Sequence, residues 1–76
     1  MSTYNGHPSW NAWNVSLWIN NDEGLYNLAR ECIRYNRGRT NAAAAMLAHL
    51  RECGIYETPD GARYSVSLIR RAMRGM

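Results

Sequence analysis

Mostly apolar residues recur at helical spacing along the middle of the chain, and turn-forming residues lie on both sides of this stretch. Asn21 is expected to cap a helix there, with Asp22 and Glu23 placed to complement the positive end of its dipole. Gly38 is expected to end it. The positions of this stripe cover about a third of the helix circumference. They are Leu25, Leu28, Ala29, Cys32, Ile33 and Asn36.

An earlier helix is predicted over residues 10–20, where Ser9 can act as the N-cap. This helix places Trp10, Trp13 and Leu17 on one face and further apolar residues on its other faces. We expect its tryptophans to pack in the core, with a binding interface as the alternative, because so small a domain needs its aromatic side chains for burial. The Trp, Val and Ile content also suits a strand, so that alternative stays open.

A third helix is predicted after Thr40, which is expected to cap it, and before Gly54 at its C-terminal end. The alanines at residues 42–45 supply helix propensity and allow close approach of a neighbouring helix. The apolar face of this helix is expected to contain Ala43, Met46, Leu47, Leu50 and Cys53.

The last helix follows the turn-forming residues 58–61, Thr-Pro-Asp-Gly, and Ser65 is expected to cap it. Its inward positions are expected to be Val66, Ile69, Met73 and Met76. A short strand near residues 62–68 is the alternative, because apolar and polar residues alternate there. The fold class predicted is therefore all-α, a bundle of about four short helices, with an α+β arrangement as the alternative.

The length of 76 residues allows one small domain over residues 1–76, with residues 1–8 interpreted as a loose N-terminal leader. No apolar run approaches the ~20 residues needed to span a bilayer, and the N-terminus lacks a signal pattern. We therefore expect a cytoplasmic protein whose two Cys are reduced. Because one core of this size supplies limited stability, a homodimer or a bound partner is a further expectation.

Charge is unevenly distributed, and all nine basic residues are Arg. Residues 1–29 contain two acidic residues and no basic one, whereas residues 30–76 carry nine Arg against four acidic residues, a balance of +5. Guanidinium groups suit bidentate contacts with phosphate or carboxylate. We therefore expect a partner-binding surface on the basic part of the chain, with Tyr26 and Tyr35 near enough to stack on bases. Its predicted residues are Tyr26, Arg30, Arg34, Arg37, Arg39, Arg70, Arg71 and Arg74.

Two plainer interpretations of the Arg residues stay open. Arg30 and Arg34 can pair with Glu31 or other acidic residues on a solvated face, where ion pairs contribute little. The use of Arg in place of Lys, together with nine Ala, is also what a GC-rich genome produces.

Metal-binding and catalytic arrangements are not expected. His49 and Cys53 lie one helical turn apart, but the chain has no C-x-x-C pair and too few ligands for zinc. Cys32 and Cys53 are interpreted as small core residues, and His49 as a residue at the edge of the apolar face. So small a bundle leaves little volume for a water-shielded cleft. We therefore predict no catalytic residues, no metal and no cofactor, and a protein that is not an enzyme.

Most of the chain resembles a family of small phage and mobile-element proteins of unknown function. The run Trp-Asn-Val-Ser-Leu-Trp-Ile at residues 13–19, followed by Asn21-Asp22 and Leu25-Tyr26, carries the resemblance, as do the Thr-Pro-Asp-Gly turn and the Met-Arg-Gly-Met end at residues 73–76. The family usually has Asn-x-Glu-Thr before the first Trp of this run, where this chain has Ser-Trp-Asn-Ala at residues 9–12. The resemblance implies a phage-type source and assigns no catalytic residues.

Three functions are compatible with these observations. The first is a non-enzymatic inhibitor of a host defence complex, such as a CRISPR effector, that acts by covering a protein surface; the net charge of +3 argues against mimicry of DNA. The second is a small basic regulator that binds nucleic acid, although no helix-turn-helix spacing is present. The third is a structural accessory protein.

Overall fold

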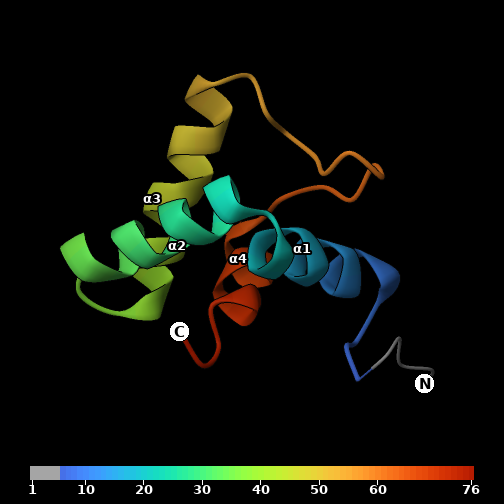
Figure 1. Ribbon diagram of the computed structural model, residues 1–76, viewed down its shortest axis with the longest axis horizontal. Helices are drawn as coiled ribbons and strands as arrows, with labels where there is room; N and C mark the ends of the chain where they lie inside the picture. Colours follow the sequence, from blue (N-terminus) through green and yellow to red (C-terminus); the bar gives the residue numbers. More distant parts are fainter. Residues whose placement is uncertain (1–5) are drawn as a thin grey trace.

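Four α-helices make up the regular structure of residues 6–76, the part of the chain that the computed structural model describes (Figure 1). α1 contacts α2 and α4, and α3 contacts the same two helices, so the four helices form a closed ring. The prediction of an all-α bundle is confirmed. The helices are α1 Trp10–Asn21, α2 Glu23–Tyr35, α3 Arg39–Glu52 and α4 Val66–Ala72.

Both strand alternatives are wrong. Residues 10–20 are helical, and the pairing around residues 62–68 is limited, in the described part of the chain, to one isolated antiparallel bridge between Glu57 and Arg63. This bridge closes the turn at residues 58–61, where the Gly61 N–H donates to the Thr58 carbonyl at 2.9 Å. Within residues 6–76, none of the helices is long and apolar enough to cross a lipid bilayer.

Side-chain caps begin three of the helices. Ser9 and Ser65 cap α1 and α4 as predicted, and each hydroxyl accepts from the N–H three residues ahead. The cap of α2 is Asp22, whose carboxylate accepts from the Leu25 N–H at 3.0 Å, so the prediction of Asn21 is wrong by one residue. α1 continues through Asn21, which leaves that residue inside a helix.

α3 begins two residues earlier than a Thr40 cap predicts, so the prediction of Thr40 as its cap is wrong. Gly38 occupies the N-cap position with φ +83, and no side chain caps this helix. The left-handed backbone at Gly38, which glycine adopts without a steric cost, turns the chain from α2 into α3. Gly38 therefore starts α3, while α2 has already ended at Tyr35.

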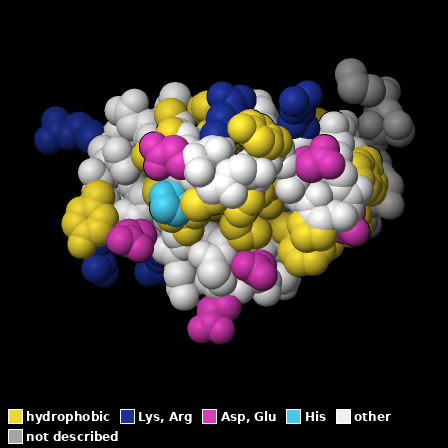
Figure 2. All heavy atoms as spheres, turned by 90° about the horizontal axis from the view of Figure 1, so that it is seen from above, with side chains coloured by type: hydrophobic (Ala, Val, Ile, Leu, Met, Phe, Trp, Pro, Cys, Tyr) yellow, Lys and Arg dark blue, Asp and Glu magenta, His cyan; other side chains and the backbone are white. Residues whose placement is uncertain are grey.

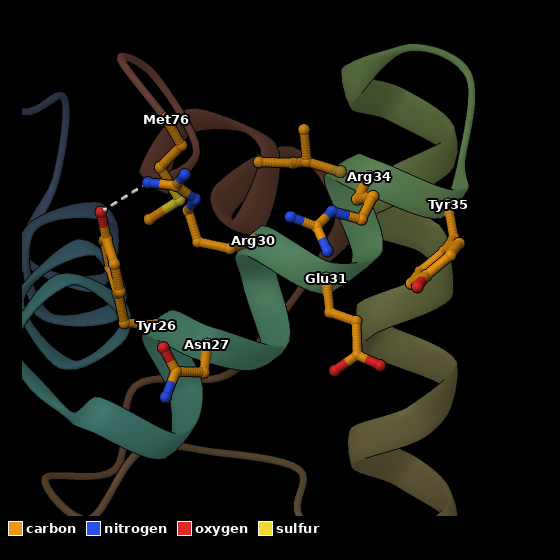
Figure 3. A pocket seen from close by; sticks show the side chains of 8 residues that line it. Tyr26, Asn27, Arg30, Glu31, Arg34, Tyr35 and Met76 are labelled. Atoms are coloured by element: carbon orange, nitrogen blue, oxygen red, sulfur yellow. Dashed lines mark hydrogen bonds between the residues drawn. The ribbon is translucent and has the colours of Figure 1, made fainter.

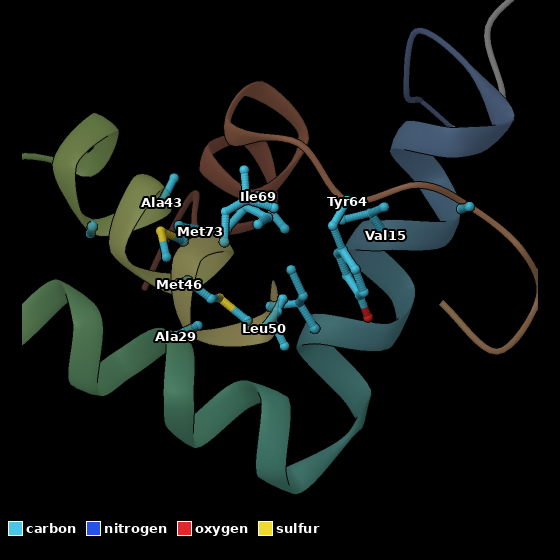
Figure 4. Packing of buried hydrophobic residues seen from close by; sticks show 13 residues of the cluster. Val15, Ala29, Ala43, Met46, Leu50, Tyr64, Ile69 and Met73 are labelled. Atoms are coloured by element: carbon cyan, nitrogen blue, oxygen red, sulfur yellow. The ribbon is translucent and has the colours of Figure 1, made fainter. Parts of the chain in front are cut away.

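The core lies where α4 meets α1 and α3 (Figure 4). α3 contributes Ala42, Ala43, Met46, Leu47 and Leu50, which confirms most of its predicted face. Cys53 is exposed, because it lies past the last helical turn of α3 as its C-cap. α4 contributes Ile69 and Met73, both fully buried, while Val66 and Met76 are half-buried against the core.

The inward face of α1 differs from the prediction. Its buried apolar residues are Ala12, Val15 and Ile19, whereas Trp10 and Leu17 are each 38% exposed. Both sets recur at helical spacing, so periodicity alone does not choose between them. The buried apolar residues of α1 are small or β-branched, and the core cluster of the described residues contains none of the tryptophans. The prediction that the tryptophans form the core is therefore wrong.

A polar network attaches the segment 53–64 to α1. Asn14, only 1% exposed, accepts from the Thr58 hydroxyl at 2.6 Å and donates to the Asp60 carboxylate at 2.9 Å. The indole N–H of Trp18 donates to the same Asp60 oxygen at 2.9 Å, and Thr58 also accepts from the Ala62 N–H. No buried side-chain polar atom of the described residues lacks a partner, and the bonds of Asn14 and Trp18 to residues 58–60 fix how the long connection crosses the bundle.

The network predicts an acid-sensitive contribution to stability. Hydrogen bonds from Asn14 and then Trp18 lower the pKa of Asp60 below its ordinary value. Because the folded-state pKa is lower than the unfolded one, the ionised carboxylate stabilises the fold above the unfolded pKa, and this stabilisation is lost as the pH falls through the folded pKa. Asp60→Asn is expected to have a lower Tm than the unmodified protein at pH 7. Its Tm is also expected to fall less than that of the unmodified protein from about pH 5 to pH 3. Parallel Tm–pH curves for the two proteins would contradict this.

Candidate anion-binding surface

One turn of α2 brings Tyr26 and Arg30 together. The Arg30 guanidinium donates to the Tyr26 hydroxyl at 3.1 Å, and its carbon lies 5.8 Å from the centre of the Tyr26 ring. Arg34 follows one turn later, and Figure 3 shows it beside Arg30 while the Glu31 carboxylate points away. These residues line a hollow of about 610 Å³ together with Met76. The spacing that predicted this part of the surface is therefore realised on α2.

The other two Arg residues predicted for this basic edge, Arg37 and Arg39, do not continue the face of α2. α2 ends at Tyr35, so Arg37 lies in the connection between helices and lines neither of the two Arg-containing hollows. Arg39 is not a loop residue but the first residue of α3. Its guanidinium donates to the carbonyl oxygen of Met76, which ties the beginning of α3 to the end of the described chain.

The second Arg cluster surrounds the C-terminal end of α4. Arg70 and Arg74 are exposed, and Arg74 lies just after the helix, which ends at Ala72. Arg71 is half-buried and donates to His7 Nδ1 at 3.3 Å and to the Gly6 carbonyl at 3.2 Å. Arg71 thus holds the start of the described chain; the rest of the predicted leader, residues 1–5, lies outside the described residues.

The structure joins the two clusters through Arg39 and Met76. Arg39 lines a hollow of about 440 Å³ with the three Arg of the α4 cluster, and the Met76 that it contacts lines the hollow of the α2 cluster. We call the combined surface the Arg face. It consists of Tyr26, Arg30, Arg34, Arg39, Arg70, Arg71, Arg74 and Met76.

The guanidiniums of the Arg face are not neutralised by carboxylates. Within residues 6–76 no Arg forms an ion pair with Asp or Glu, and Arg34, Arg70 and Arg74 have no side-chain hydrogen bond. The alternative in which Arg30 and Arg34 pair with Glu31 is therefore wrong for this structure. Both side chains are exposed, and apart from the bond of Arg30 to Tyr26 their N–H groups have donor capacity left for an anion.

The thiols and His49 do not form a comparable centre. Cys53 Sγ lies 3.9 Å from His49 Nε2, and both residues are exposed. Burial, with a smaller contribution from Glu31, raises the pKa of the Cys32 thiol, which disfavours the nucleophilic thiolate. In the described part of the chain, no three His, Cys, Asp or Glu side chains are grouped so that they could hold a metal ion.

Sequence reasoning missed two features of this surface. The bond from Arg39 to Met76 uses a backbone carbonyl, which carries no side-chain signal. The separation of most acidic side chains from the Arg face was also missed, because it depends on how the helices pack. Among the described residues, Glu31 is the one acidic side chain that lines either Arg-containing hollow.

The fold and the Arg face together define a small all-helical protein with an uncompensated basic surface. No curated protein and no solved structure is significantly similar to the chain. The chain belongs to a family of unknown function, DUF7249, whose model matches residues 1–76.

Proposed function

We propose that this protein is a small, non-enzymatic nucleic-acid-binding protein that uses the Arg face to hold a phosphate backbone. The observation that carries the proposal is the merging of two Arg clusters, from α2 and from the end of α4, through the contact between Arg39 and Met76. Guanidiniums spaced over α2, α3 and the end of α4 suit a polyanion better than a single small anion.

The electrostatics of the Arg face support this proposal. The guanidiniums of Arg34, Arg70 and Arg74 are unpaired. Arg30 and Arg39 each use only part of their N–H donors in hydrogen bonds within the protein. Tyr26 lies against Arg30 at the edge of the same surface, where an aromatic ring can stack on an unpaired base. Most of the binding free energy would come from phosphate contacts and be independent of base sequence.

Binding is expected to depend steeply on salt. Three to five phosphate contacts predict a slope of log K against log salt of about −3 to −4.5, or roughly a 40- to 500-fold loss of affinity between 50 and 200 mM salt. Fluorescence polarisation with a labelled 20-base-pair duplex of random sequence, and with one of its single strands, measures this slope. Absence of binding to both probes at 50 mM salt would disprove the proposal.

Two matched double charge reversals distinguish binding through the Arg face from a general effect of net charge. Arg70→Glu with Arg74→Glu is expected to weaken binding at least about 10-fold. Arg51→Glu with Arg63→Glu changes the net charge equally at exposed positions that line neither Arg-containing hollow, and should weaken binding less than about 3-fold. Both variants should keep a Tm close to that of the unmodified protein, since none of these four side chains forms a hydrogen bond or ion pair.

A second candidate is an inhibitor that covers a host defence complex, such as a CRISPR effector, in the bacterial cytoplasm. The observation in its favour is the exposure of aromatic side chains, Tyr35 at 72% and Trp10 at 38%, because aromatic residues with Arg are enriched at protein-binding hot spots. The resemblance to small phage proteins supports a phage source for such an inhibitor. Its mechanism would be steric. Affinity purification from the bacterial host followed by mass spectrometry tests it.

A further inference from the structure

The core-facing stripe of α2 has one margin, on the side away from Tyr26 and Arg30, that the rest of the bundle covers only in part. Leu25, Leu28 and Cys32 are half-buried there, and Tyr35 is exposed at the end of the helix. These positions follow the spacing i, i+3, i+7 and i+10, so they form one line along the helix. Over ten residues the line extends about 15 Å, close to three helical turns.

Two hollows are lined by residues of this line, and another lies beside one of them along α1. One, of about 400 Å³, lies between α2 and the segment 53–64 and is lined by Trp18, Leu25 and Ile55 among others. A second shares Trp18 with it and adds Leu17, and a third lies between α2 and α3 beside Leu28 and Cys32. We call the three together the apolar groove. Figure 2, which looks onto the side formed by the end of α3 and the segment 53–64, shows a band of apolar side chains across it.

The edges of the apolar groove carry negative charge. Asp22, Glu31 and Glu57 are among its lining residues, and no Arg of the described chain is. In Figure 2, carboxylates surround the apolar band while Lys and Arg colours lie toward the margin. The hollows of the apolar groove are therefore lined by acidic and not by Arg side chains, and of the three acidic residues only Glu31 also lines an Arg-containing hollow.

We propose that the apolar groove binds an amphipathic helix of a partner protein whose apolar face is flanked by Lys or Arg. The line from Leu25 to Tyr35, which borders two of the three hollows, has the length of about three helical turns, and apolar hollows along such a line suit a docked amphipathic helix. The carboxylates of Asp22, Glu31 and Glu57 select basic flanks by charge complementarity. This proposal is independent of nucleic-acid binding, because it uses none of the Arg of the Arg face.

A second copy of this chain fits the groove poorly. A two-fold dimer through this surface would place the same acidic edges against each other, and juxtaposed like charges oppose association. The Arg face of another copy offers complementary charge, but Arg70 and Arg74 are free guanidiniums rather than apolar side chains that could fill the groove.

The test uses two labelled 18-residue helical peptides with Leu at positions i, i+3, i+4 and i+7 of each repeat, one with Lys and one with Gln at the flanking positions. Fluorescence polarisation at 50 mM salt is expected to show the Lys peptide binding about 10-fold tighter than the Gln peptide. Glu57→Lys should weaken the Lys peptide at least about 5-fold and change the Gln peptide less than about 2-fold. Equal affinity for the two peptides would overturn the proposal.

A neighbouring pair of substitutions controls for loss of apolar surface. Ile55→Ser removes a groove residue that is 40% exposed, and should weaken both peptides at least about 5-fold. Tyr56→Ser removes a side chain that is 52% exposed but lines none of the hollows of the groove, and should leave both affinities within about 2-fold. Arg70→Glu with Arg74→Glu should bind the Lys peptide at least as well as the unmodified protein.

Sedimentation velocity tests whether a second copy of this chain occupies the groove instead. We expect a monomer at micromolar concentration in the absence of peptide. A dimer that Ile55→Ser dissociates would assign the groove to a second copy and overturn the proposal.

Discussion

Replacing Ile69 by alanine is expected to lower the free energy of unfolding by about 3–4 kcal/mol and the Tm by about 12 °C or more. Ile69 is fully buried in α4 and belongs to the core cluster that α1 and α3 share. With seven residues, α4 is too short to be stable alone, so its helical structure depends on that contact. Denaturant unfolding followed by circular dichroism measures the loss.

A graded series keeps this prediction testable if Ile69→Ala does not fold. Ile69→Val removes one methylene and should cost about 0.5–1.5 kcal/mol. Leu28→Ala is the comparison at a half-buried position on α2, where about 1–2 kcal/mol is expected because part of the side chain already contacts water. Equal losses for Ile69→Ala and Leu28→Ala would show that α4 is not the centre of the core.

The second large effect is expected at Asn14. Asn14→Ala should cost about 2–3 kcal/mol, because the buried Thr58 hydroxyl loses its acceptor and Asp60 loses a donor. Thermal unfolding at pH 7 measures the effect. Asn11 is the matched control: it lies one turn earlier on α1, is exposed, and Asn11→Ala should change stability by less than about 0.5 kcal/mol.

A double-mutant cycle with Thr58→Val assigns the effect at Asn14 to the hydrogen-bond network. Thr58→Val keeps the shape of the side chain and removes its hydroxyl, so the loss in Asn14→Ala should be smaller in that background by about 1 kcal/mol. Additive losses would show that Asn14 stabilises the protein by packing alone.

The helices could be predicted from sequence because local signals agree there. Ser9 and Ser65 cap as expected, and the stripe of α2 faces the core, with Ala29 buried and its other apolar members half-buried. α1 was different because it is apolar nearly all round. Which face of α1 turns inward depends on how this helix packs against α4, a helix distant in sequence.

The Arg face was predictable residue by residue but not as a surface. The spacing of Arg30 and Arg34 placed them on one side of α2, whereas Arg37 was assigned to that side only because the helix was expected to reach Gly38. Nothing in the sequence indicates that Arg39 meets Met76, since a contact to a backbone carbonyl depends on tertiary structure. The same holds for Asp60, which was interpreted as a turn residue and proved to be a double hydrogen-bond acceptor.

The closed ring of helices has a consequence for how the chain folds. α2 and α3 are joined by only three residues, so their pairing closes a small loop and is favoured early. The contact between α1 and α4 spans nearly the whole chain and carries the greatest loop-closure entropy. The folding transition state is thus expected to contain the α2–α3 hairpin. α1 and α4 are expected to pair after the transition state during folding and to separate first during unfolding.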